Sequence, residues 1–79
     1  MNGKKDNFGN DFRRAREENG WNVAEVAELL GLTGNAVHKW ESGENFPTVK
    51  RWKSIKNILK IDPAEYRYTV IENNTVSMQ

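Results

Sequence analysis

The chain has 79 residues, a net charge of +1, one histidine and no cysteine. This length predicts one small domain, and the composition excludes a disulfide framework and a zinc site built from cysteine and histidine. Its apolar runs are too short to span a membrane, and its polar start is not a secretory signal. We therefore expect the protein in the cytoplasm of a bacterial cell, and its gene could belong to the bacterium or to a phage. No nucleophile with its base and no metal cluster is evident, so we expect no enzyme activity, no cofactor and no small-molecule substrate.

The positive charge is concentrated in the middle of the chain. Residues 34–60 contain six basic residues against two acidic ones, whereas the flanking segments are close to neutral or acidic. A run of lysines by itself is typical of a solvated helix face, but a surface that faces phosphate groups has the same composition. The helix signals along the chain are needed to decide between the two interpretations.

The first predicted helix follows a polar stretch, residues 1–7, that we expect to be flexible. Apolar side chains recur from there at helical spacing, and Gly20 ends the segment. These side chains are Phe8, Phe12 and Ala15. We expect the folded domain to span residues 8–66.

Two short helices with a glycine between them are predicted next. The first covers about residues 23–30, begins with a capping box formed by Asn22 and Glu25, and ends at Gly31. The second covers about residues 34–42; its N-cap is Thr33, its inward residues are Val37 and Trp40, and Gly43 closes it. Two short helices joined by a glycine-containing turn are typical of a helix-turn-helix, here residues 23–42.

A fourth helix, about residues 49–60, is predicted after a short loop. Its N-cap is Thr48, and the side chains expected to point inward are Val49, Trp52, Ile55, Ile58 and Leu59. Asp62 and Pro63 then open a short fifth helical turn, after which Tyr66 is expected to pack on the bundle. The predicted fold class is all-α.

Three stretches of the sequence together resemble the phage repressor/Cro-type (XRE) helix-turn-helix family. They are residues 12–21, residues 24–33, and residues 37–43 followed by Pro47, so the resemblance covers about residues 8–66. It implies a compact five-helix repressor-like bundle, usually a homodimer that reads a palindromic operator in double-stranded DNA. It also implies a buried ion pair between Arg16 and Glu41, since a partly buried carboxylate needs such a partner.

The third helix is expected to read bases in the major groove through its N-terminal part. Its outward residues, and thus the candidates for base contact, are Gly34, Asn35, Ala36, His38 and Lys39. Asn35 suits an adenine edge, Lys39 a guanine and Ala36 a thymine methyl group. His38 has no second ligand nearby, so no metal role is expected. An ordinary solvated helix surface is the alternative interpretation of the same polar residues.

Phosphate contacts are expected at the two helix starts and on the flanking helices, because helix N-termini offer backbone amides to phosphate. The candidates are Asn22, Val23, Thr33 and Ser42 in the motif, and Arg13, Arg14, Lys50 and Arg51 on the flanking helices. Val23 stands where relatives often carry a glutamine, and Glu44 stands where many are basic. We therefore expect anchoring to depend on backbone amides and on the first and fourth helices.

The tail, residues 67–79, allows two interpretations. Tyr68, Val70 and Val76 favour a strand, and Asn73 with Asn74 suits a two-residue hairpin turn. Because a lone hairpin is marginal in water, such a hairpin would need to pack on the helices or pair with a second chain, which would make it a dimerisation element. A frayed tail is the alternative.

Three functions are compatible with these features. The first is a sequence-specific, repressor-like transcriptional regulator. The second is an excisionase or MerR-like DNA-binding protein, in which a β wing would follow the motif. The third is an antitoxin-type protein-interaction module, which an exposed apolar patch without basic neighbours would favour. The lysine-rich helix predicted after the motif favours the first.

Overall fold

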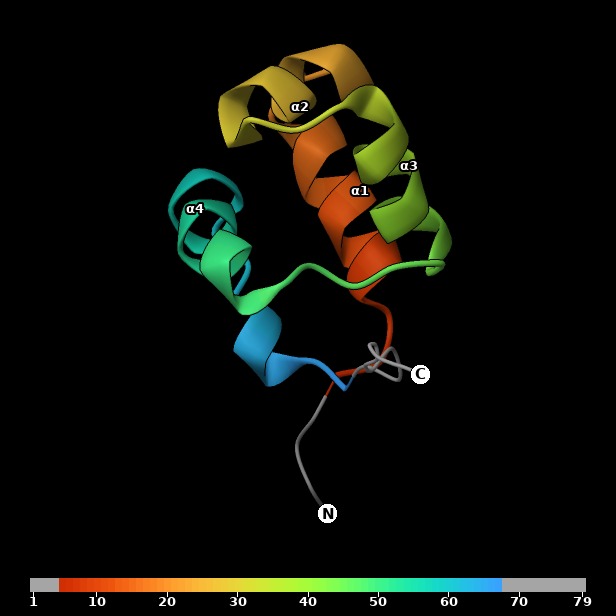
Figure 1. The fold of residues 1–79 in the computed structure, drawn as a ribbon, viewed down its shortest axis with the longest axis vertical. Helices are drawn as coiled ribbons and strands as arrows, with labels where there is room; N and C mark the ends of the chain where they lie inside the picture. Colours follow the sequence, from red (N-terminus) through yellow and green to blue (C-terminus); the bar gives the residue numbers. More distant parts are fainter. Residues whose placement is uncertain (1–4, 68–79) are drawn as a thin grey trace.

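The structure, a computed structural model, describes residues 5–67. Its α-helices are α1 (Phe8–Glu18), α2 (Val23–Leu30), α3 (Gly34–Ser42) and α4 (Val49–Leu59), followed by one 3-10 turn, η1 (Pro63–Glu65). In Figure 1, α1 lies in the middle with α3 along one side, α4 on the other and α2 near its C-terminal end. The predicted all-α class is confirmed for this range, and none of its helices is long and apolar enough to cross a membrane.

The short fifth turn predicted from Asp62 and Pro63 is present as the single 3-10 turn η1, but the full fifth helix of the five-helix bundle that the family resemblance implies is not formed. Asp62 Oδ1 accepts from the Ala64 amide at 3.0 Å, as expected of an N-cap. The backbone then becomes extended at Tyr66 (φ −108°, ψ 145°) and pairs with Lys5, whose amide donates to Glu65 O at 2.9 Å. Pairing with the N-terminal segment takes the place of further helical turns. The predicted C-terminal hairpin, residues 68–79, and residues 1–4 lie outside the described residues.

The side-chain caps predicted at the starts of α2 and α3 are present, and the one predicted at the start of α4 is not. Asn22 Oδ1 accepts from the Glu25 amide, and Glu25 Oε1 accepts from the Asn22 amide, both at 2.8 Å. Thr33 Oγ1 accepts from the Ala36 amide at 3.2 Å. Thr48 is the N-cap residue of α4, but its side chain makes no capping hydrogen bond, so that part of the prediction is wrong.

The core is one cluster shared by all the helices. Its buried members are Phe8, Phe12, Val26, Ala27, Leu30, Val37, Trp40, Ile55, Leu59 and Tyr66. Phe12 from α1 meets the edge of Trp40 from α3, with 5.6 Å between ring centroids. Because an aromatic pair of this kind joins α1 to α3 at the centre of the cluster, it fixes the second helix of the motif on the first helix of the fold.

The inward face predicted for α4 needs one correction. Val49 is 69% exposed, whereas Ile55 and Leu59 are buried as expected. Side chains tilt toward the N-terminus of a helix, so the side chain of its first residue extends past the helix end instead of onto the bundle. Trp52 is half-buried, and its indole Nε1 donates to Pro47 O at 2.9 Å.

The C-terminal end of the described chain is anchored on α1 through Tyr66. Its hydroxyl donates to Asp11 Oδ2 at 2.7 Å, and its ring packs edge-on against Phe8. Burial of the phenol, and then the hydrogen bond to the Asp11 carboxylate, raise the pKa of Tyr66 well above its ordinary value. The folded state therefore binds the phenolic proton more tightly than the unfolded chain does.

Replacing Tyr66 with phenylalanine should lower the free energy of unfolding by about 1.5 kcal/mol at neutral pH, since one hydrogen bond to a charged group is lost. Because the folded-state pKa is raised, the contribution of this phenol is complete below the unfolded value of about 10 and is lost as the pH rises above it. Urea unfolding at several pH values should show a smaller loss of stability above that pH for Y66F than for the parent protein. If the free energy of unfolding depended on pH in the same way in Y66F and in the parent protein, the raised pKa assigned to Tyr66 would be contradicted.

Candidate nucleic-acid interface

The turn between α2 and α3 is held by hydrogen bonds from both sides. Gly31 closes α2 in the left-handed region (φ 70°), and the Leu32 amide donates to Ala27 O at 2.8 Å. From α4, Arg51 Nη1 donates to Leu30 O at 2.9 Å and so satisfies a carbonyl at the end of α2. These contacts give α2 and α3 the geometry of a helix-turn-helix.

Arg16 and Glu41 join α1 to the C-terminal part of α3. Arg16 Nε and Nη2 donate to the two carboxylate oxygens of Glu41 at 2.7 Å and 3.1 Å, and Nη1 donates to Trp21 O at 3.0 Å. The side chains are 11% and 9% exposed, respectively. The hydrogen bond with Glu41 raises the pKa of Arg16, against the opposite effect of burial. The ion pair that the family resemblance implies is therefore present, in a bidentate geometry that fixes α3 as well as neutralising the two charges.

Gly9 marks a close approach of α1 and α3 that the sequence analysis did not identify. A Cβ atom at this position would lie 2.5 Å from Glu41 O and 2.7 Å from Trp40 O. Those oxygens belong to the backbone of α3 and cannot move aside like a flexible side chain. A glycine inside a predicted helix was the available signal, because glycine costs about 1 kcal/mol there relative to alanine.

The predicted base-contact residues lie around the part of α3 that the core does not bury, with Asn35 and His38 turned away from the core and the others at its edges. Asn35 and His38 are exposed, and Gly34, Ala36 and Lys39 are half-buried. Val37 and Trp40, on the opposite face, are 0% and 6% exposed. The structure thus brings the five candidates together on one short helical surface, which we call the α3 face.

Several predicted phosphate-contact residues already have partners within the chain. The carboxamide oxygen of Asn22 and the hydroxyl of Thr33 accept the capping hydrogen bonds described above. Ser42 Oγ donates to Lys39 O at 3.2 Å and accepts from the Glu44 amide. Val23 is half-buried and packs on the core. The motif can therefore offer phosphate mainly its backbone amides.

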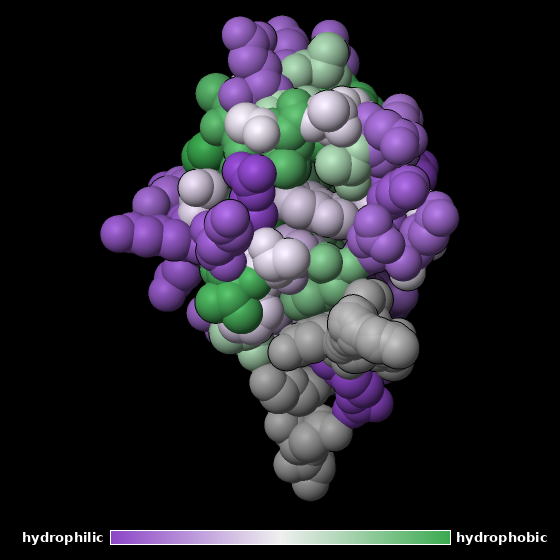
Figure 2. Space-filling model, in the orientation of Figure 1, coloured by the Kyte–Doolittle hydropathy of each residue, from purple (hydrophilic) through white to green (hydrophobic). Residues whose placement is uncertain are grey.

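The predicted basic contacts differ in how firmly they are held. Arg13 lies 3.6 Å from Glu17 and Arg14 lies 3.4 Å from Asp11, in both cases as exposed pairs on α1. Arg51 is bound to Leu30 O, whereas Lys50 is exposed and makes no ion pair among the described residues. Figure 2 shows hydrophilic side chains over both α4 and α3 at the two flanks of the molecule.

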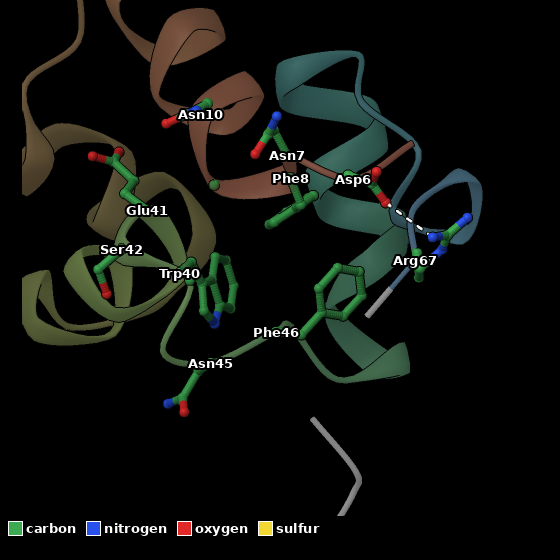
Figure 3. A pocket seen from close by; sticks show the side chains of 12 residues that line it. Asp6, Asn7, Phe8, Asn10, Trp40, Glu41, Ser42, Asn45, Phe46 and Arg67 are labelled. Carbon is green, nitrogen blue, oxygen red and sulfur yellow. Dashed lines mark ion pairs between the residues drawn. The ribbon is translucent and has the colours of Figure 1, made fainter. Parts of the chain in front are cut away.

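A pocket of about 370 Å³ lies beside the end of α3, where it meets the start of α1. Phe8, Trp40 and Phe46 form its apolar part, and Asp6 pairs with Arg67 at 3.6 Å on its rim (Figure 3). In the described part of the chain no group of three or more histidine, cysteine, aspartate or glutamate residues could hold a metal ion. The described residues that line the pocket therefore include no metal-ligand set of this kind.

Comparison with known proteins agrees with this geometry. The model of a family described as Helix-turn-helix matches residues 12–66. The chain belongs to the XRE-type helix-turn-helix family. No curated protein sequence matches this family member significantly.

Two solved structures share the fold of this helix-turn-helix domain. One is described as the master regulator for biofilm formation SinR in complex with DNA; the TM-score is 0.62 at 19% identity, covering 72% of this chain and 95% of that one. The other is a transcriptional regulator from Listeria innocua, with a TM-score of 0.66 at 22% identity, covering 86% of this chain and 66% of that one. Both are regulators by description, and the likeness at these identities concerns the fold.

The element that follows the helix-turn-helix separates two of the predicted functions. An excisionase or MerR-like protein would have a β wing there, whereas this chain has the lysine-bearing helix α4. The described residues contain one isolated β-bridge, between Lys5 and Tyr66, and it lies far along the chain from the motif. This arrangement favours the repressor-like interpretation.

Proposed function

We propose that the chain is a sequence-specific DNA-binding transcriptional regulator of the repressor type, which places α3 in the major groove. The observation that carries the proposal is the α3 face, a set of polar and small residues held rigidly by the Arg16–Glu41 pair and the Phe12–Trp40 contact. A recognition surface that is already ordered loses little conformational entropy when it binds, and this favours specific recognition of DNA bases. The DNA in the SinR structure supports this choice of ligand.

The α3 face reads bases through residues with distinct hydrogen-bonding capacities. Asn35 pairs its carboxamide with an adenine edge, and Lys39 donates to guanine O6 and N7. Ala36 contacts a thymine methyl group, and Gly34 lets the helix start approach the groove closely. His38 adds a donor and an acceptor on the same exposed side of the helix.

Phosphate is held by the helix starts and by the basic flanks. The N-termini of α2 and α3 offer backbone amides at Val23 and Thr33, whereas the Asn22 amide already donates to Glu25, so a contact from Asn22 would have to come from its side chain. The α3 end residue Ser42 is a further proposed contact. The longer-range charge comes from Arg13 and Arg14 on α1 and from Lys50 and Arg51 on α4. Salt should weaken this second set most, since each phosphate contact releases counterions.

Two copies of the chain act together in this proposal, as a homodimer on a palindromic operator. One α3 face reaches only a few base pairs, and two faces related by a two-fold axis double the length of sequence that is read. Selection of bound sites from a random DNA pool tests the proposal directly. We expect inverted repeats with half-sites about one helical turn apart; a pool with no enriched sequence would overturn it.

Asn35→Ala should lower affinity for the selected operator by about 1 to 3 kcal/mol and relax the preference at one base position. Lys39→Ala should have the same effect at a different position. Lys50→Ala and Arg14→Ala are the matched comparison, because they should weaken binding to all sequences and flatten the salt dependence. Binding assays on operator and single-base variants at several salt concentrations distinguish these effects. An unchanged base preference in N35A would exclude Asn35 from the reading surface.

A further inference from the structure

The outer side of α2 carries a groove whose apolar side chains, Trp21 and Leu29, are only partly covered by the rest of the domain. Trp21, Glu25, Glu28 and Leu29 line it, and its volume is about 330 Å³. Leu29 is 49% exposed and Trp21 is half-buried, although both are large apolar side chains. We call this feature the α2 groove.

The lining residues have the spacing of a helix-packing surface. Glu25, Glu28 and Leu29 stand three and four residues apart, so they share one side of α2. Trp21 extends that side beyond the helix start, because it directly precedes the N-cap residue. The core-facing residues Val26, Ala27 and Leu30 lie on a different side. On this second side of α2 the apolar surface is supplied by Leu29 together with the partly buried Trp21, and the fold leaves it incompletely covered.

The negative charge of the two glutamates in the α2 groove determines which kind of molecule can bind there. In the described part of the chain neither Glu25 nor Glu28 lies within ion-pair distance of a cation. One oxygen of Glu25 accepts the capping hydrogen bond from the Asn22 amide, and its second oxygen makes no such bond. Carboxylates repel the phosphate backbone, so nucleic acid is excluded from this surface.

We propose that the α2 groove is a docking site for a cationic amphipathic helix of another protein. An apolar side chain of that helix packs between Trp21 and Leu29, and its flanking lysine or arginine residues pair with Glu25 and Glu28. This is the helix-in-groove mode of recognition, and charge complementarity requires the partner helix to be positively charged. The site is separate from the α3 face, so it assigns to the chain a protein-binding surface in addition to the DNA-binding one.

A synthetic probe of defined sequence tests the proposal on the full chain. The probe is a helical peptide of about 15 residues with leucines at helical spacing between lysines, compared with the same peptide carrying glutamates in place of the lysines. The three tryptophans give separate indole Nε1–H signals in a nitrogen–proton correlation spectrum. We expect the lysine peptide to shift the Trp21 signal and to leave Trp52, whose indole is bound to Pro47 O, unchanged. The glutamate peptide should shift none of them.

Matched variants separate docking from general charge attraction. Glu28→Lys and Leu29→Ser should each weaken binding of the lysine peptide about tenfold, whereas Glu44→Lys, with the same charge change on an exposed residue outside the groove, should change it less than about twofold. Equal losses in E28K and E44K would overturn the proposal. So would shifts of the Trp21 signal by the glutamate peptide, or the absence of any shift with the lysine peptide. If L29S dissociates the free protein from dimer to monomer in sedimentation, a second copy covers the groove and the proposal is wrong.

Discussion

Replacing Glu41 with alanine is expected to lower the free energy of unfolding by about 3 to 5 kcal/mol, and Arg16→Ala should have an effect of the same size. Each variant leaves one charge in a site where the side chains are only 11% and 9% exposed. A folded chain of this length has about 4 to 12 kcal/mol in total, so either variant should lie close to the unfolding threshold. Urea unfolding followed by circular dichroism measures the loss.

Two comparisons show whether the loss comes from an unpaired buried charge. The double variant R16M/E41L removes both charges and fills similar volume, so it should recover much of the stability that either single variant loses. The pair between Arg13 and Glu17 is about 60% exposed on both sides, and Arg13→Ala should change stability by less than about 1 kcal/mol. A loss in E41A no larger than that in R13A would mean that the buried pair is not important for the fold.

Local signals predicted most of the helices correctly. These signals are the capping box of Asn22 and Glu25, the N-cap Thr33, and the glycines that follow α2 and α3. In each case the interacting groups lie within a few residues of each other, so a short stretch of sequence contains the whole interaction. Helical spacing likewise predicted the buried sides of α1, α2 and α3, because a helix that packs on a core repeats its apolar residues with the period of the helix. The α3 face follows from the same period, as the side left over once Val37 and Trp40 are buried.

The errors concern features that depend on residues far apart in the sequence. The family resemblance implies a fifth helix, but only the turn η1 forms, because Tyr66 binds Asp11 and its backbone pairs with Lys5, two residues that are far away in the sequence. Arg51 stays a predicted phosphate contact, and no local pattern indicates that it also donates to Leu30 O across the bundle. Val49 fits the apolar spacing of α4 but lies at its first position, where the helix has not yet reached the core.

Gly9 and Gly34 are both helical glycines, and alanine should have opposite effects on stability at the two positions. At Gly9 the new Cβ would lie 2.5 Å from Glu41 O, so α1 and α3 must separate, and we expect a loss of about 2 to 3 kcal/mol. At Gly34 the nearest atom is Val23 Cγ1 at 3.5 Å, an ordinary contact. Alanine is the better helix former by up to about 1 kcal/mol, so G34A should be as stable as the parent protein or slightly more so.

The same pair of variants separates the fold from the interface. G9A should lose DNA affinity together with stability, because α3 is displaced from its position on α1. G34A should lose DNA affinity while remaining stable, since the new methyl group would lie on the α3 face, where the start of the helix approaches the major groove of DNA. Urea unfolding and operator binding on the same preparations measure both quantities. A G34A protein with undiminished affinity would remove Gly34 from the contact surface, and a G9A protein with parental stability would contradict the close approach of α1 and α3.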